Sequence, residues 1–228
     1  MLILFFSGTR KMNLTAVTDV DEVMERHIKD SLAMLPPIQD SYISRSNSSI
    51  DSIKLVDVGT GAGLPGLVFA IACPAWKVTL LESMNKRCDF LEHAVSVTGL
   101  SNVEVVRGRA ENLGQNVTFR EKFDVAVARA VAEMRIFRKL TVKARAAKGH
   151  NPQEEVRNAE RSLKLMGASV LQLCSVESHS PYGQRTAIIC SKDHPTPRKY
   201  PRDPGSSAVA ARYLISEAIS AHQTMFIQ

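Results

Sequence analysis

A glycine-rich turn directly after an apolar run constrains this chain more than any other feature. Residues 53–58 are mostly apolar with Asp57 among them, and four glycines follow at close spacing: Gly59, Gly61, Gly63 and Gly66. Such a run is typical of a buried parallel strand, and glycines allow positive φ and close approach of a ligand to the backbone. The sequence therefore predicts a strand, a tight turn and a helix that opens near Pro65.

The glycines allow two interpretations of the ligand. Gly61, Gly63 and Gly66 have the GxGxxG spacing of a dinucleotide-binding turn, which favours NAD or another nucleoside cofactor. Asp57 lies two positions before Gly59, and this Asp-x-Gly-x-Gly-x-Gly pattern resembles motif I of the methyltransferases that use S-adenosylmethionine (SAM). The acid favours SAM, and the alternatives are a nicotinamide-dependent oxidoreductase and a turn that binds nothing.

Length, charge and cysteine spacing limit the class of protein. A chain of 228 residues can bury one sizeable core, so we expect one α/β domain with appendages. The formal net charge of +6 favours a polyanionic partner, although many basic proteins bind none. The 4 cysteines stand far apart without a CxxC pair, which indicates neither a zinc ribbon nor a disulfide framework. Residues 1–6 are too short for a signal peptide and no stretch is long enough to span a membrane, so we expect a soluble intracellular protein.

An amphipathic helix is expected before the glycine turn. A capping signal at Thr18 precedes apolar residues at helical spacing, and Pro36 with Pro37 should end this helix. His27 lies on or beside the apolar stripe with Ser31. This position predicts a packed, hydrogen-bonded histidine rather than a ligand-binding one.

Strands and helices alternate along the rest of the chain, after a serine-rich segment at residues 39–52 that predicts a loop. The predicted strands are residues 53–58, 77–81, 103–106, 124–128, 168–176 and 186–190, and the predicted helices are residues 64–73, 86–98 and a segment that opens at residues 151–154. This order predicts a Rossmann-like α/β fold, a doubly wound and mostly parallel sheet with helices on both faces. The last two strands should form an antiparallel hairpin.

Ligands of such sheets bind at the carboxyl ends of the strands, which selects further candidate residues. Glu82 ends the second strand and is placed to accept hydrogen bonds from ribose hydroxyls, or else to cap a helix. Ala110 and Glu111 follow the third strand, where an adenine edge could be bound. Arg129 follows the fourth strand, as a binding group or as a partner in a surface salt bridge.

Several separate runs, in this order, resemble one family, the ribosomal RNA small subunit methyltransferase G proteins, also called glucose-inhibited division protein B. The matching runs are residues 13–16, 26–32, 57–66, 80–83 with 86–87, 108–111 and 128–132, extended by 148–149 and 198–205. The resemblance implies a helical cap and linker over residues 1–52, a SAM-dependent methyltransferase domain over residues 53–192, and a basic, proline-containing, irregular tail over residues 193–228.

The family resemblance implies SAM-dependent transfer of a methyl group to N7 of a guanine in small-subunit (16S) ribosomal RNA. The partner would be that RNA or the assembling small subunit, in the cytoplasm of a bacterium or the chloroplast stroma of a plant, and we expect a monomer. The family's cofactor positions correspond here to Gly59, Leu64, Ala110, Glu111 and Arg129. The residue-level argument adds four further positions: Asp57, Gly61, Gly63 and Glu82.

The chemistry of guanine N7 sets the demands on the catalytic residues. N7 has a free lone pair and no proton to lose, so attack on the methyl requires alignment more than a general base. N7 and O6 form a paired acceptor edge that a cation can hold, which makes Arg129 and Lys148 the candidates for a catalytic role. A-form RNA hides this edge in a deep, narrow groove, so a loop or a partly assembled particle is the expected substrate.

Three departures from the family pattern favour a second hypothesis. The chain begins close to the run at residues 13–16, and residues 206–228 replace the usual ending. Residues 133–147 are short, charged and without a Gly-Gly turn, which contradicts a strand buried on both faces and favours a solvated helix over an RNA-contacting surface. A non-catalytic remnant that binds SAM or RNA is therefore the alternative to an active enzyme.

Overall fold

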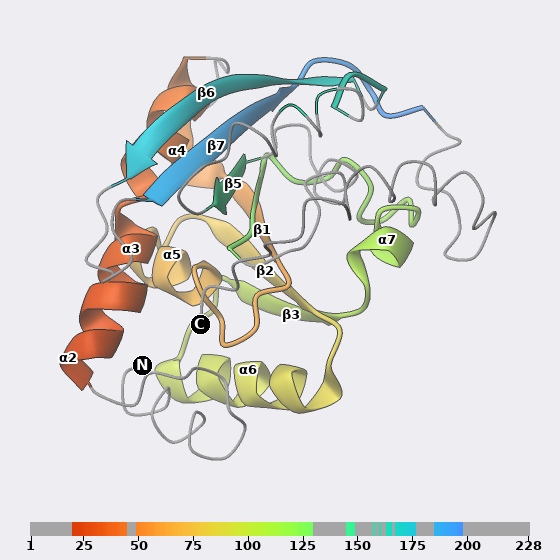
Figure 1. Cartoon of the computed structure of the whole chain (residues 1–228). Coiled ribbons are helices and arrows are strands. Elements are labelled where there is room, and N and C mark those ends of the chain that lie inside the picture. Colours follow the sequence, from red (N-terminus) through yellow and green to blue (C-terminus); the bar gives the residue numbers. More distant parts are fainter. Residues whose placement is uncertain are drawn as a thin grey trace, which may run out of the picture.

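The computed structural model describes residues 20–44, 49–129, 145–148, 157, 160, 163–165, 167–176 and 185–197. Its centre is a four-stranded parallel sheet in the order β3-β2-β1-β4, next to a three-stranded sheet in the order β5-β7-β6 (Figure 1). The strands of the parallel sheet are β1 (Lys54–Val58), β2 (Lys77–Glu82), β3 (Val103–Arg107) and β4 (Val125–Val127). This confirms the predicted α/β architecture with parallel strands.

The register of the parallel strands brings the polar ends of three strands to one edge. Asp57 of β1 is paired with Leu80 of β2 and with Val127 of β4, and Glu82 of β2 is paired with Arg107 of β3. Because the strands run in the same direction, the residues after Val58, Glu82 and Val127 leave the sheet on one side. Candidate residues from three separate parts of the sequence therefore share that edge.

Helices α5 (Gly66–Ala72), α6 (Asn85–Thr98) and α7 (Ala110–Leu113) connect the strands. Helix α6 ends as predicted at Gly99, whose φ of 66° is the left-handed conformation of a C-terminal cap. Helix α5 begins two residues later than predicted, with Pro65 as its N-cap. The main core lies between this sheet and its helices, and its fully buried large side chains include Ile53, Leu55, Phe69, Leu80 and Leu91.

The N-terminal helical segment differs in detail from the prediction. It consists of α2 (Val20–Val23), a π-helical stretch η1 (Met24–Lys29) and α3 (Asp30–Leu32), followed after two turn residues by α4 (Leu35–Ile43). The predicted stop at Pro36 and Pro37 is wrong, because both prolines lie in the first turn of α4, where a missing N–H costs nothing. The predicted loop at residues 39–52 is helical up to Ile43 and again in the 3-10 turn η2 (Ile50–Ser52).

The segment from α2 to α3 packs against the glycine turn and α5 (Figure 1). Five buried apolar side chains form this contact: Val23, Ile28, Ala62, Leu64 and Val68. His27 is buried, as predicted for a packed histidine. The N-terminal helices are thereby fixed beside the edge of the sheet that carries the candidate residues.

The second sheet contains β5 (Arg145–Lys148), β6 (Ala168–Val176) and β7 (Arg185–Lys192). Strands β6 and β7 pair antiparallel, which confirms the predicted closing hairpin. Strand β5 also pairs antiparallel with β7 and lies beside β4, so the expectation of a helix is wrong at residues 145–147. Residues 130–144, most of the helix expected after residue 151, and residues 198–228 of the expected tail lie outside the described residues.

The remaining class predictions concern membranes, cysteines and metals. None of the helices in the described part of the chain is long and apolar enough to cross a bilayer. All four cysteines are free thiols: Cys73, Cys88, Cys174 and Cys190. Within the described residues, no group of three or more histidine, cysteine or acidic side chains is arranged to hold a metal ion.

Candidate functional site

The glycine turn between β1 and α5 has a backbone that only glycine adopts readily. Gly59, Gly61 and Gly63 have φ values of 66°, 60° and 89°. The backbone amides of Gly59 and Thr60 donate to the carbonyl of Leu81, at 2.8 and 3.2 Å, which anchors the turn to the end of β2. The turn therefore lies at the carboxyl edge of the sheet, as predicted.

The buried side chain of Asp57 holds both ends of this turn through hydrogen bonds. Its Oδ2 accepts a hydrogen bond from Thr60 Oγ1 at 2.6 Å and another from the backbone N–H of Gly66 at 2.8 Å. The side chain is completely buried, and its Oδ1 has no hydrogen-bond partner among the described residues. Asp57 thus organises the turn, and one buried acceptor atom is left unused.

Burial of Asp57 has a consequence for its ionisation. The pKa of Asp57 is raised from an ordinary value of 3.8 to about 6, mainly by burial and to a smaller extent by the charge of Glu82. The hydrogen bonds from Thr60 and Gly66 and the charge of Arg129 oppose this shift. The folded state therefore holds the Asp57 proton more tightly than the unfolded state does.

The raised pKa predicts that the stability contributed by Asp57 is largest below pH 4 and is lost as the pH rises towards 6. The free energy of unfolding should change by roughly 3 kcal/mol over this pH range, because each pKa unit corresponds to about 1.4 kcal/mol. Urea unfolding of the wild type and of Asp57→Asn between pH 4 and 7.5 measures this change. The wild type should lose stability relative to the variant over this window, and parallel curves would contradict the prediction.

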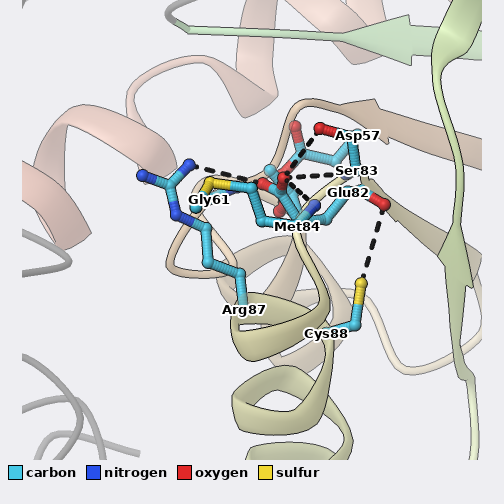
Figure 2. Close-up of polar contacts among 8 residues, drawn as sticks. Asp57, Gly61, Glu82, Ser83, Met84, Arg87 and Cys88 are labelled. Carbon is cyan, nitrogen blue, oxygen red and sulfur yellow. Dashed lines mark hydrogen bonds and ion pairs between the residues drawn. The ribbon is translucent and has the colours of Figure 1, made fainter. Parts of the chain in front are cut away.

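Glu82 occupies the centre of the site and is bound by backbone amides (Figure 2). Its Oε1 accepts from the N–H groups of Ser83 and Met84, at 2.7 and 3.0 Å, and its Oε2 accepts from the N–H of Gly61 at 3.1 Å. Arg87 Nη1 lies 3.6 Å from Oε2. The carboxylate therefore holds the glycine turn and the start of α6 together, and ribose binding by Glu82 stays a prediction that uses its remaining acceptor capacity.

The glycines of the turn differ in how much space surrounds them. A Cβ on Gly63 would lie 2.3 Å from Leu67 Cδ1, and a Cβ on Gly66 would lie 2.3 Å from Leu80 Cδ2, so packing excludes side chains at both positions. Among the described residues, the nearest atom to a Cβ on Gly61 would be the carbonyl oxygen of Gly59, at 4.0 Å. The turn is therefore closed towards the core and open at Gly61, where a ligand can approach the backbone.

Arg129 lies two residues beyond the end of β4, and its side chain reaches the N-terminal helical segment. Its Nη2 lies 3.4 Å from His27 Nδ1, and its Nη1 lies 3.4 Å from Ser31 Oγ. Arg129 is also close enough to Asp57 to lower the pKa of that carboxyl. Arg129 lies at the predicted edge of the sheet, but the sequence did not identify His27 and Ser31 as its neighbours, since their spacing of four residues shows only that the two share a helix face.

The other candidates surround this centre at different depths. Leu64 is buried against α5, and Ala110 is buried where α7 begins. The N–H of Gly108 donates to the carbonyl of Glu82 at 2.9 Å, which brings the segment before Ala110 to the end of β2. The side chains of Glu111 and Lys148 lie outside the described residues, and only their backbone positions in α7 and β5 are known.

The geometry fits a ligand that approaches the backbone of the glycine turn. The turn offers open backbone at Gly61 beside Glu82, whereas the Asp57 carboxyl is completely buried beneath it. Each acid has an arginine nearby: Arg87 Nη1 lies 3.6 Å from Glu82, and Arg129 is close enough to Asp57 to act on its pKa. The open backbone at Gly61, and not the net charge of the site, is therefore the feature that suits a nucleoside ligand.

Comparison with known proteins gives consistent matches. A family model described as rRNA small subunit methyltransferase G matches residues 4–185. The "Ribosomal RNA small subunit methyltransferase G" proteins of Carboxydothermus hydrogenoformans and Streptococcus uberis are 39% and 38% identical to the chain. These alignments cover 89% and 86% of this chain and 85% and 82% of the relatives.

Solved structures show the same fold at low sequence identity. The METTL16 MTase domain superposes with a TM-score of 0.56 at 15% identity, and it covers 85% of this chain and 79% of that chain. A variant of MtNAS in complex with S-adenosylmethionine superposes with a TM-score of 0.55 at 13% identity, over 85% of this chain and 73% of that chain. These likenesses confirm the predicted Rossmann-like fold.

Proposed function

The chain belongs to the rRNA small subunit methyltransferase G family, and from this we propose that it transfers a methyl group from SAM to N7 of a guanine in small-subunit ribosomal RNA. The observation that carries the proposal is the turn that Asp57 organises, open at Gly61 and bordered by Glu82 and Arg129. The cofactor is SAM, which supplies an electrophilic methyl group on a sulfonium centre.

Nine residues would hold the cofactor: Asp57, Gly59, Gly61, Gly63, Leu64, Glu82, Ala110, Glu111 and Arg129. Their roles follow from the contacts in the protein. Glu82 fixes the N–H of Gly61 and retains acceptor capacity for a ribose hydroxyl. Open backbone at Gly61 permits close approach of the cofactor.

The protein residues that act on the RNA align the base rather than ionise it. Guanine N7 attacks through a lone pair that is already free, so no side chain has to remove a proton first. Arg129 and Lys148 are the candidates to hold the N7 and O6 edge, because a cationic donor matches two adjacent acceptors. Arg129 follows β4 at the same edge of the sheet as the glycine turn, which suits this alignment.

The proposed partner is small-subunit ribosomal RNA or the assembling small subunit. The net charge of +6 suits a polyanion, and the deep groove of A-form RNA makes an unpaired or partly assembled guanine the accessible target. One chain contains all the candidate positions, so a monomer suffices. The reaction belongs in the bacterial cytoplasm, or in the chloroplast stroma of a plant.

The proposal is tested with small subunits from a strain that lacks this methylation. We expect the purified chain to transfer labelled methyl from SAM to these subunits, and we expect borohydride and aniline cleavage to locate the label at N7 of one guanine. Protein-free RNA duplex should be a poor substrate. SAM binding without transfer would favour the non-catalytic remnant, and label at another atom would overturn the N7 assignment.

A second prediction separates ligand binding at Gly61 from folding. Gly61→Ala places a methyl group in the open space of the turn, so we expect SAM affinity to fall by at least about tenfold. Gly99→Ala is the matched control, since Gly99 has a similar φ of 66° and its added Cβ would have no atom of the described part of the chain within 4 Å. Both variants should lose about 1 kcal/mol of stability for the left-handed backbone. Equal SAM affinity in the two variants would remove Gly61 from the binding site.

A further inference from the structure

The contact between Arg129 and the N-terminal helices joins residues that are about a hundred positions apart in the chain. The two guanidinium nitrogens of Arg129 face His27 Nδ1 and Ser31 Oγ, each at 3.4 Å. His27 is in η1 and Ser31 is in α3, four residues apart and on one face of the helical segment. Both side chains are buried. The helical segment therefore presents two polar atoms to one cation.

The protonation of these two groups follows from the donor that they face. A guanidinium has only donors, so His27 must direct the lone pair of Nδ1 towards it and carry its own proton on Nε2. The hydroxyl of Ser31 donates to the backbone carbonyl of His27, which leaves the oxygen lone pairs for Arg129. Both groups can thus accept a hydrogen bond from Arg129.

The position of the two acceptors is fixed by apolar packing. Val23 and Ile28, on either side of His27, pack against Ala62, Leu64 and Val68 of the glycine turn and α5. Any movement of the helical segment would disturb this contact. The acceptors for Arg129 therefore sit on a support that also touches the proposed cofactor loop.

We propose that His27, assisted by Ser31, is a positioning residue that holds the guanidinium of Arg129 at the carboxyl edge of β4. This inference rests on the proposed function, in which Arg129 contacts the cofactor or the guanine. Without the two acceptors, a long flexible arginine side chain loses its fixed direction, at an entropic cost that binding must then supply. His27 acts through Arg129 and makes no contact with the reacting atoms itself.

The test is a double-mutant cycle with two replacements of His27. His27→Phe keeps an aromatic ring and removes the acceptor, whereas His27→Asn offers an amide oxygen near the place of Nδ1. We expect His27→Phe to weaken SAM binding or lower kcat by about tenfold, as for the loss of a hydrogen bond to a charged group. His27→Asn should stay within about threefold of the wild type. His93→Phe, at an exposed histidine of α6, is the control and should have no effect.

The combination with Arg129→Ala distinguishes positioning from packing. If His27 acts through Arg129, His27→Phe has no further effect on SAM binding or kcat once Arg129 is alanine. Effects that multiply in the double variant, or equal losses in His27→Phe and His27→Asn, would overturn the proposal.

A readout without cofactor keeps the inference separate from the proposed function. In the ligand-free protein, the double variant His27→Phe with Arg129→Ala should lose less in unfolding midpoint than the sum of the losses in the two single variants. Losses that add up fully would show that the two side chains do not interact, whatever the chain binds. A wild type that binds no SAM while the midpoints remain coupled would overturn the proposed function alone.

Discussion

Replacing Gly66 with alanine is expected to lower the free energy of unfolding by about 3 kcal/mol, at the upper end of the cost of overpacking a core. The new Cβ would lie 2.3 Å from Leu80 Cδ2 and 2.9 Å from Asp57 Oδ2. Leu80 is completely buried in the centre of the sheet, so its side chain can give way only if its neighbours in the core repack. The substitution therefore displaces Asp57 as well, so SAM binding should also be lost, measured by urea unfolding and calorimetric titration.

Gly108→Ala is the matched control for Gly66→Ala. Gly108 has no positive φ, and its added Cβ would lie 3.2 Å from Leu113, a partly buried side chain in a short helix that can give way. We expect its free energy of unfolding to fall by less than about 1 kcal/mol. If Gly66→Ala were as stable as the control, the close packing of Gly66 against Asp57 and Leu80 would not be required for the fold.

The second large effect is expected for Asp57→Ala, which should weaken SAM binding by about a hundredfold. The substitution leaves the Thr60 hydroxyl and the Gly66 N–H without their acceptor, so the turn loses its attachment at both ends. Stability is a less sensitive measure, because loss of these hydrogen bonds is offset by removal of a buried carboxylate. Calorimetric titration with SAM therefore gives the clearer result.

Asp124→Ala is the control for a carboxylate on the same strand pair. Asp124 Oδ2 accepts from the N–H of Lys54 at 2.9 Å, at the amino end of β1 and so at the opposite end from the glycine turn. We expect this variant to lose about 1 kcal/mol of stability and to keep its SAM affinity. Equal binding losses in the two variants would mean that Asp57 acts through general stability and not through the turn.

The parts of the fold that the sequence predicted well depend on local patterns. The strands ending at Val58 and Glu82 are short apolar runs, and the end of α6 needs a left-handed residue that only Gly99 offers cheaply. The prolines at residues 36 and 37 were misinterpreted because proline both ends one helix and suits the first turn of the next. Only packing of α4 against the core decides between these two outcomes.

The candidate site was predicted in outline, but its internal contacts were not. The sequence indicated an acid before the glycines, yet only the fold shows that Asp57 binds the protein's own Thr60 and Gly66. The pairing of Arg129 with His27 depends on how an N-terminal helix packs against a strand a hundred residues later, which no local pattern encodes. β5, paired with β7, likewise shows how tertiary pairing can override a charged local sequence.

Titration calorimetry of the full chain with SAM, and in parallel with NADH, tests the central claim most directly. That claim is that the turn organised by Asp57 and open at Gly61 binds the cofactor of a methyltransferase. The account predicts one molecule of SAM bound per chain and no heat from NADH. Binding of NADH in the absence of any binding of SAM would contradict it.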